Sequence, residues 1–76
     1  MTNRQRKQID SLYDKNYDFL VSYAWGSLKN ISLAEEAAQE TFAIACEKPD
    51  QVCTCPNPEG WLVNTLKNVI HNMERR

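Results

Sequence analysis

Three cysteines and one histidine of this 76-residue chain are of types that could bind a metal ion or take part in covalent catalysis. Cys53 and Cys55 are separated by one residue, Cys46 precedes them and His71 follows. Structural zinc sites favour two or more residues between paired cysteines, so this spacing makes tetrahedral coordination awkward. A thiol–disulfide sensor and simple reduced thiols stay open as alternatives. We therefore predict no metal site and no cofactor.

A cysteine together with His71 would supply a nucleophile and a base, which is the minimum for covalent catalysis. The sequence shows no third group to orient the histidine and no turn that would donate to an oxyanion. A chain of this length buries only about 60% of its unfolded surface, and so small a core seldom encloses a substrate pocket. We predict that the protein is not an enzyme.

The segment from Ser32 to Phe42 has a spacing that suits binding. At 100° per residue, its small residues fall on one side of a helix and its acidic and amide residues on the other. The inner side comprises Ala34, Ala37, Ala38, Thr41 and Ala45, and the outer side comprises Glu35, Glu36, Gln39, Glu40 and Ala43. Ser32 is the predicted N-cap, with Glu35 completing a capping box. We predict a helix that packs closely through alanine and presents carboxylates to a basic partner.

Three helical patterns and no strand pattern predict an all-α fold, a small three-helix bundle that forms one domain over residues 1–76. The expected helices run from about 8–29, 32–48 and 58–75, and residues 49–57, rich in proline, are expected to form a loop. Whether residues 1–7 are ordered is left open. The inner stripe of the first helix comprises Ile9, Leu12, Tyr13, Tyr17, Leu20, Tyr23, Ala24 and Leu28.

The third helix has a well-marked start, because Asn57 can cap it and Pro58 can occupy its first position. Its inner stripe comprises Leu62, Leu66, Val69 and Met73. Its opposite arc is polar and comprises Asn64, Lys67, Asn68, His71, Asn72 and Arg75. We expect this arc to face solvent or a ligand.

The composition, 42% hydrophobic and 25% charged, is that of a globular protein. The net charge is −1, yet basic residues crowd both ends of the chain while acidic residues concentrate in the middle. No apolar run approaches the roughly 20 residues of a membrane span, and Met1 to Lys7 lack the apolar core of a signal peptide. We predict a cytosolic protein without a membrane partner.

The stretch from Ala34 to Phe42, Ala-Glu-Glu-Ala-Ala-Gln-Glu-Thr-Phe, resembles region two of bacterial RNA polymerase sigma factors of the extracytoplasmic-function group. Leu12-Tyr13 with Tyr17 resembles the first helix of that family. Trp61-Leu62, Lys67-Asn68 and the closing Arg75-Arg76 resemble its third helix, in the right order. The resemblance covers roughly residues 8–76 and implies a domain that recognises and melts promoters in transcription initiation.

The resemblance implies that the acidic helix docks on RNA polymerase core, at the clamp helices of its largest subunit. The contacts implied are Glu35, Glu36, Gln39 and Glu40, with Phe42 as an apolar anchor. Filling of the core is the alternative for Phe42.

The resemblance also implies that the proline-rich loop and the start of the third helix capture an unstacked base of the minus-ten element of promoter DNA. The implied contacts are Trp61, Asn64, Lys67 and Asn68, with Arg75 and Arg76 near phosphates and Val52 to Asn57 lining a base pocket. Packing on the core is the alternative for Trp61. The last helix carries fewer arginines than is usual in the family, so we expect DNA binding only when polymerase holds the protein.

The family usually continues beyond region two into a second helical domain. We expect this chain to be region two taken from a longer factor, and an unusually short protein is the alternative that the sequence leaves open. An anti-sigma factor is a further partner that the resemblance implies. The alternative function is a small helical protein-interaction module with an acidic docking face and no direct role at DNA.

Overall fold

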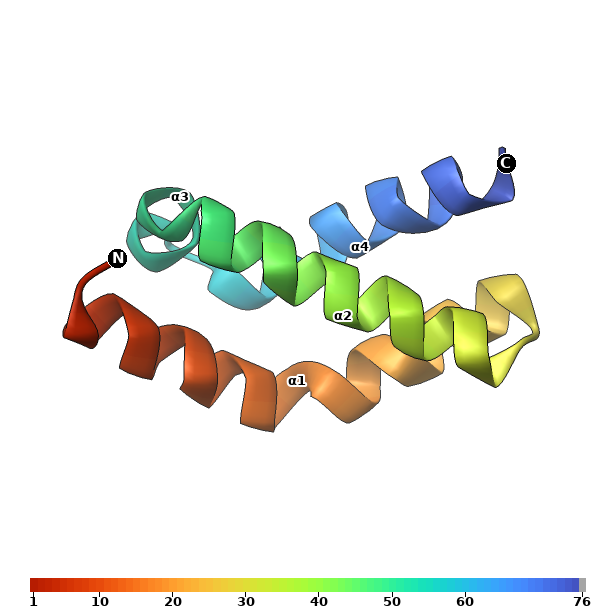
Figure 1. The fold of residues 1–76 in the computed structure, drawn as a ribbon, viewed down its shortest axis with the longest axis horizontal. Helices are drawn as coiled ribbons and strands as arrows, with labels where there is room; N and C mark the ends of the chain where they lie inside the picture. Colours follow the sequence, from red (N-terminus) through yellow and green to blue (C-terminus); the bar gives the residue numbers. More distant parts are fainter. Residues whose placement is uncertain (76) are drawn as a thin grey trace.

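The computed structural model describes residues 1–75, which form four α-helices and contain no strand (Figure 1). The helices are α1 (Asn3–Leu28), α2 (Ile31–Glu47), α3 (Pro49–Thr54) and α4 (Pro58–Glu74). The all-α fold is confirmed, but the bundle contains a fourth, short helix. The whole bundle measures 35 × 21 × 18 Å.

Helix α1 begins at Asn3, earlier than the predicted start near residue 8. The Thr2 hydroxyl accepts a hydrogen bond from the Gln5 backbone N–H at 3.1 Å, and the Gln5 side-chain oxygen accepts one from the Thr2 backbone N–H at 3.0 Å. These reciprocal bonds form a capping box, which satisfies two N–H groups at the start of the helix. The segment whose order the sequence left open is therefore helical from Asn3 on.

The turn between α1 and α2 takes two residues and makes the helices antiparallel (Figure 1). Lys29 has a φ of 55°, the left-handed conformation typical of a helix C-terminus. Asn30 is the N-cap of α2, because its side-chain oxygen accepts a hydrogen bond from the Leu33 N–H at 3.0 Å. The predicted cap at Ser32 is wrong. Asparagine caps a helix as well as serine does, and the left-handed Lys29 reverses the chain early enough for Asn30 to take that place.

The inner side of α2 packs against its neighbours as the sequence predicts. Its five small residues, Ala34, Ala37, Ala38, Thr41 and Ala45, are buried. The Thr41 hydroxyl donates to the Ala37 carbonyl at 2.9 Å, so this polar group is satisfied inside the core. Small side chains let α1 and α4 approach α2 closely.

The predicted stripe of α1 is wrong at two of its tyrosines. Tyr13 and Tyr23 are 39% and 37% exposed, whereas Asn16 is only 8% exposed. The Asn16 side chain donates to the Leu12 carbonyl at 3.0 Å, which lets an amide replace an apolar residue in the core. The buried face of α1 is therefore narrower than the sequence pattern.

The loop predicted at residues 49–57 is wrong over Pro49–Thr54, which form α3. Pro49 occupies the first turn, where a missing N–H costs nothing, and Asp50 places a negative charge near the helix N-terminus. Val52 is fully buried and anchors α3 to the core. The start of α4 is as predicted, with the Asn57 side chain accepting from the Gly60 N–H at 3.2 Å.

Candidate functional site

The acidic face of α2 comprises Glu35, Glu36, Gln39 and Glu40, and all four side chains are exposed. Ser32, Glu35, Glu36 and Gln39 line a shallow hollow on this helix. The Gln39 amide donates to the Tyr17 hydroxyl at 3.5 Å, which connects the acidic face to α1. The arrangement presents carboxylates to solvent, and it suits a basic surface.

Phe42 belongs to the core, the alternative that the sequence left open. It is 5% exposed, and its ring centroid lies 4.8 Å from that of Tyr13. Tyr13 stacks on Tyr17 at 4.9 Å and keeps much of its ring in solvent. The spacing of Tyr13 matches the middle of the apolar stripe, so no signal in the sequence pattern indicated that its ring is exposed.

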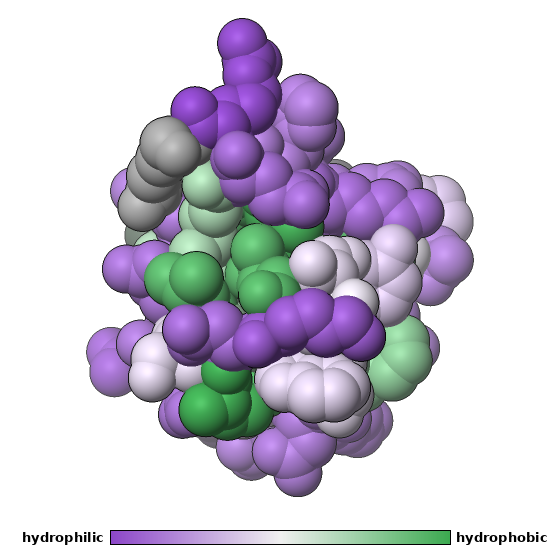
Figure 2. Space-filling view, turned by 90° about the vertical axis from the view of Figure 1, so that its right-hand side faces the viewer, coloured by the Kyte–Doolittle hydropathy of each residue, from purple (hydrophilic) through white to green (hydrophobic). Residues whose placement is uncertain are grey.

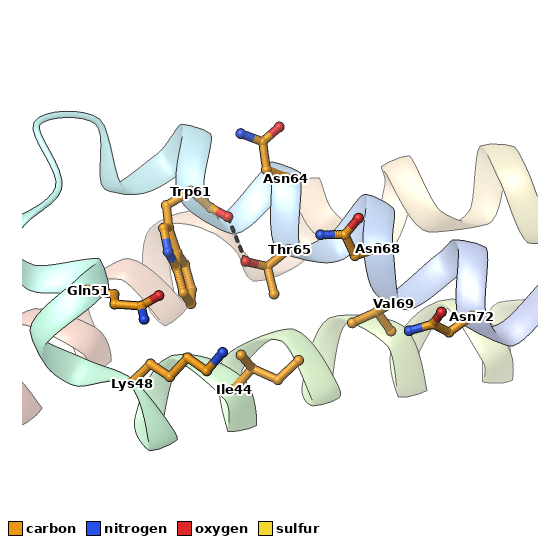
Figure 3. Close-up of a pocket in the computed structure, with 9 residues that line it drawn as sticks. All are labelled: Ile44, Lys48, Gln51, Trp61, Asn64, Thr65, Asn68, Val69 and Asn72. Carbon is orange, nitrogen blue, oxygen red and sulfur yellow. Dashed lines mark hydrogen bonds between the residues drawn. The ribbon is translucent and has the colours of Figure 1, made fainter.

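A second feature, the α4 groove, lies between α4 and the junction of α2 with α3 and has a volume of about 380 Å³ (Figure 3). The residues that line it are Ile44, Lys48, Gln51, Trp61, Asn64, Thr65, Asn68, Val69 and Asn72. Figure 3 shows the Trp61 ring extending from α4 toward Lys48 and Gln51. The groove thus combines an indole, several amides and one ammonium group.

Three of the residues predicted to contact DNA, Trp61, Asn64 and Asn68, meet in this groove. Lys67 and Arg75 are exposed on α4 or at its end but do not line it. Arg76 lies outside the described residues.

None of the residues from Val52 to Asn57, which were predicted to line a base pocket, lines the α4 groove, although Asn57 lines a separate hollow beside α1 and the start of α4. Val52 is fully buried in the core. The Asn57 side chain caps α4.

Trp61 contacts both the core and the α4 groove. Its ring is half-buried and packs against the core, yet it also forms part of the groove wall. Its backbone carbonyl accepts a hydrogen bond from the Thr65 hydroxyl at 2.8 Å, drawn as the dashed line in Figure 3. An indole held on one side by the core offers a preorganised surface for stacking.

Lys48, Gln51 and Asn72 line the groove and were not among the predicted contacts. Asn72 follows Asn64 and Asn68 at four-residue steps, so the sequence held the signal that these amides share one row of a helix. For Lys48 and Gln51 no such signal exists, because they come from the α2–α3 junction and from α3 and reach α4 only through the tertiary fold.

The three cysteines are free thiols, with Cys46 exposed and the other two half-buried. Burial raises the pKa of the Cys53 thiol, and the Asp50 carboxylate raises it further. Within residues 1–75, no three side chains of histidine, cysteine, aspartate or glutamate come together as metal ligands would. None of the helices in that range has the length and apolar character needed to cross a membrane.

Apolar side chains also reach the surface at the end of the bundle where α1 turns into α2 (Figure 2). They include Trp25, Ile31 and Leu33. The Lys29 ammonium lies 4.8 Å from the Trp25 ring centroid and covers part of this apolar surface. None of the sequence-predicted contact residues belongs to it.

The comparisons with known proteins give one match. A family model described as Sigma-70 region 2 matches residues 12–76. No curated protein and no solved structure matches the chain. The matched range contains the acidic face and the α4 groove.

Proposed function

Because the chain belongs to the sigma-70 region 2 family, we propose that it connects RNA polymerase to melted promoter DNA through two separate faces. Region 2 is a non-catalytic part of a sigma factor and serves promoter recognition and polymerase binding. The observation that carries the finer proposal is the α4 groove, where an indole, an amide row and a lysine surround one hollow that shares no residue with the hollow on the acidic face.

The acidic face is the proposed contact with the clamp helices of the polymerase's largest subunit. Glu35, Glu36, Gln39 and Glu40 are exposed on one helix, so they can meet a basic surface together. Complementary charge mainly sets the rate and orientation of encounter, whereas a desolvated aromatic ring adds affinity. Tyr13 takes the anchoring role that the sequence suggested for Phe42, because its ring is the exposed one of that pair.

The α4 groove is the proposed site for an unstacked base of the minus-ten element. Single-stranded bases are bound by stacking on aromatic rings and by hydrogen bonds to their edges. Trp61 supplies the ring, Asn64 and Asn68 supply amides, and Lys48 supplies a positive charge for a phosphate. Lys67 and Arg75 are exposed outside the groove and are proposed contacts for further phosphates, as is Arg76.

We also propose that the chain belongs to the extracytoplasmic-function group and that an anti-sigma factor covers one or both faces. The protein would act where the polymerase acts, in the bacterial cytoplasm. These points rest on the sequence motif from Ala34 to Phe42.

The test is a pull-down with polymerase core, combined with photocrosslinking to the non-template strand of a melted promoter. The wild-type protein should bind polymerase and crosslink to the strand within the complex. Glu40→Lys should weaken polymerase binding without lowering the melting temperature, and Asn68→Ala should lose crosslinking while still binding polymerase.

Two matched variants serve as controls, one for the reversal of a surface charge and one for the truncation of an exposed side chain on α4. Asp18→Lys reverses an exposed carboxylate on α1, and His71→Ala shortens an exposed side chain of α4 that does not line the groove. Both should behave as wild type. Polymerase binding without any crosslink would favour the protein-interaction module, and no polymerase binding at all would contradict the docking proposal.

A further inference from the structure

The N-terminal residues Thr2–Gln8, which cap and begin α1, lie outside the range that matches the family, yet Gln5 and Gln8 among them contact α3. We propose that Gln5 and Gln8 are positioning residues that hold the α3 wall of the α4 groove. The inference rests on the proposed function for its consequence in DNA binding, but the positioning itself can be measured without DNA.

Two glutamines connect α1 to both ends of α3. The Gln5 side-chain amide donates to the Asp50 carboxylate at 2.6 Å, in the first turn of α3. The Gln8 amide donates to the Cys53 carbonyl at 3.4 Å, and the Cys53 thiol lies 3.9 Å from the Gln5 carbonyl as a weak donor. The short helix is thus held at its start and near its end by one neighbour.

The Gln5 side chain is itself fixed by the capping box. Its oxygen accepts from the Thr2 N–H at 3.0 Å, which turns its NH₂ group toward Asp50. One side chain therefore both starts α1 and binds α3. A glutamine in this orientation loses little further rotamer freedom when it makes the second bond.

Helix α3 depends on such contacts. It has six residues and no side-chain hydrogen bond at its N-cap, Lys48. Helices of this length are unstable alone, because nucleation costs more than so few hydrogen bonds return. Packing of Val52 and Cys53 against the core and contacts with α2 and α4 support α3, and the hydrogen bonds from α1 add to this support at both ends of the helix.

The position of α3 decides the shape of the α4 groove. Gln51 follows Asp50 directly, and Lys48 precedes the helix. Both line the groove opposite Trp61, as Figure 3 shows. A shift of α3 therefore moves the wall against which a base would lie, although Gln5 and Gln8 touch neither Trp61 nor the groove.

The Gln5→Glu variant removes the hydrogen bond to α3 and keeps the helix cap of α1. Glutamate at this position still completes a capping box, but its carboxylate repels Asp50. We expect about fivefold faster hydrogen exchange at the N–H groups of Gln51 and Val52, which donate to the Lys48 carbonyl at 3.1 and 3.3 Å. We also expect about threefold weaker binding of a single-stranded minus-ten oligonucleotide by the polymerase-bound protein, with exchange in α2 unchanged.

Adding Asp50→Asn to Gln5→Glu should restore both measurements. The new amide can donate to the new carboxylate, so the hydrogen bond returns with reversed polarity and the net charge equals that of the wild type. Ser11→Glu is the matched control, because it adds the same charge at an exposed position of α1 and should change neither measurement.

Three results would overturn the inference: unchanged exchange in Gln5→Glu, no rescue by Asp50→Asn, or faster exchange with unchanged binding of the oligonucleotide. Failure of the wild-type complex to bind the oligonucleotide would instead contradict the proposed function. The exchange rates and their rescue would then decide the positioning role by themselves.

Discussion

The acidic face and the α4 groove are built in different ways. All four residues of the acidic face lie on α2, whereas the groove takes residues from α2, α3, α4 and the junction before α3. A face on one helix follows from the helical repeat of a short sequence. A groove between helices depends on how those helices pack, so a substitution outside the groove can change its shape.

The two features also differ in the forces that they offer a ligand. The acidic face presents exposed carboxylates, whose attraction is screened by salt. The groove presents a half-buried indole, whose stacking depends mainly on contact and dispersion. A change of charge or of salt should therefore affect mainly binding at the acidic face, and a change of the indole should affect mainly binding in the α4 groove.

The largest effect is expected from Trp61→Leu. It should weaken binding of a minus-ten oligonucleotide to the polymerase-bound protein about tenfold, because a stacked base contributes roughly 1–3 kcal/mol. Binding to polymerase should be unchanged. Fluorescence anisotropy of a labelled oligonucleotide measures the loss.

Trp61→Phe is the matched control, since it keeps an aromatic ring, and it should retain most of the affinity. A leucine variant that binds as well as wild type would show that Trp61 serves only the core.

A rise in salt from about 50 to 200 mM should weaken polymerase binding about fivefold, since exposed charges are screened over a Debye length of roughly 10 Å. The ratio of oligonucleotide affinities between wild type and Trp61→Leu should stay constant over the same range. Titrations at several salt concentrations measure both quantities.

Glu36→Gln should flatten the salt dependence of polymerase binding, and an unchanged slope would exclude Glu36 from that contact.

The start of α2 should respond to Asn30 and not to Ser32. Asn30→Ala removes the side chain that accepts from Leu33 and should lower the free energy of unfolding by about 1 kcal/mol. Ser32→Ala should leave it nearly unchanged. Thermal or urea denaturation of the two variants gives the comparison, and a larger loss in Ser32→Ala would return the cap to the position predicted from the sequence.

The smallest effect concerns the thiols. Cys46 should react with iodoacetamide about threefold faster than Cys53 near pH 7.5, because Cys46 is exposed and the raised pKa of Cys53 lowers its thiolate fraction. The difference should shrink as pH rises through the raised pKa of Cys53, where that thiol ionises. Peptide mapping by mass spectrometry measures the rates. Asp50→Asn should bring them closer, and equal rates in the wild type would contradict the burial of Cys53.

Much of the fold could be predicted because its signals are local. The division of α2 into a buried alanine side and an exposed acidic side follows from spacing, and the structure has both. The start of α4 follows from Asn57 and Pro58, whose chemistry suits only a few backbone positions. The exposed asparagine row of α4 follows in the same way.

The errors fall where contacts between helices outweigh local preference. Residues 49–54 lack a helical period, yet Val52 in the core and two glutamines of α1 hold them as a helix. Asn16 is buried while the neighbouring Tyr13 is exposed, because the Leu12 carbonyl accepts a hydrogen bond from the Asn16 side-chain amide. No window of neighbouring residues contains these partners.

The sequence by itself determined the three long helices α1, α2 and α4, most of their polar faces and the family to which the chain belongs, because caps and periodic spacing act between residues a few positions apart. Only the tertiary structure decided that Phe42 is buried while Tyr13 is exposed. It alone brought Lys48 and Gln51 opposite Trp61. The physical reason is that burial and groove shape arise from packing between helices, which joins residues that lie far apart along the chain.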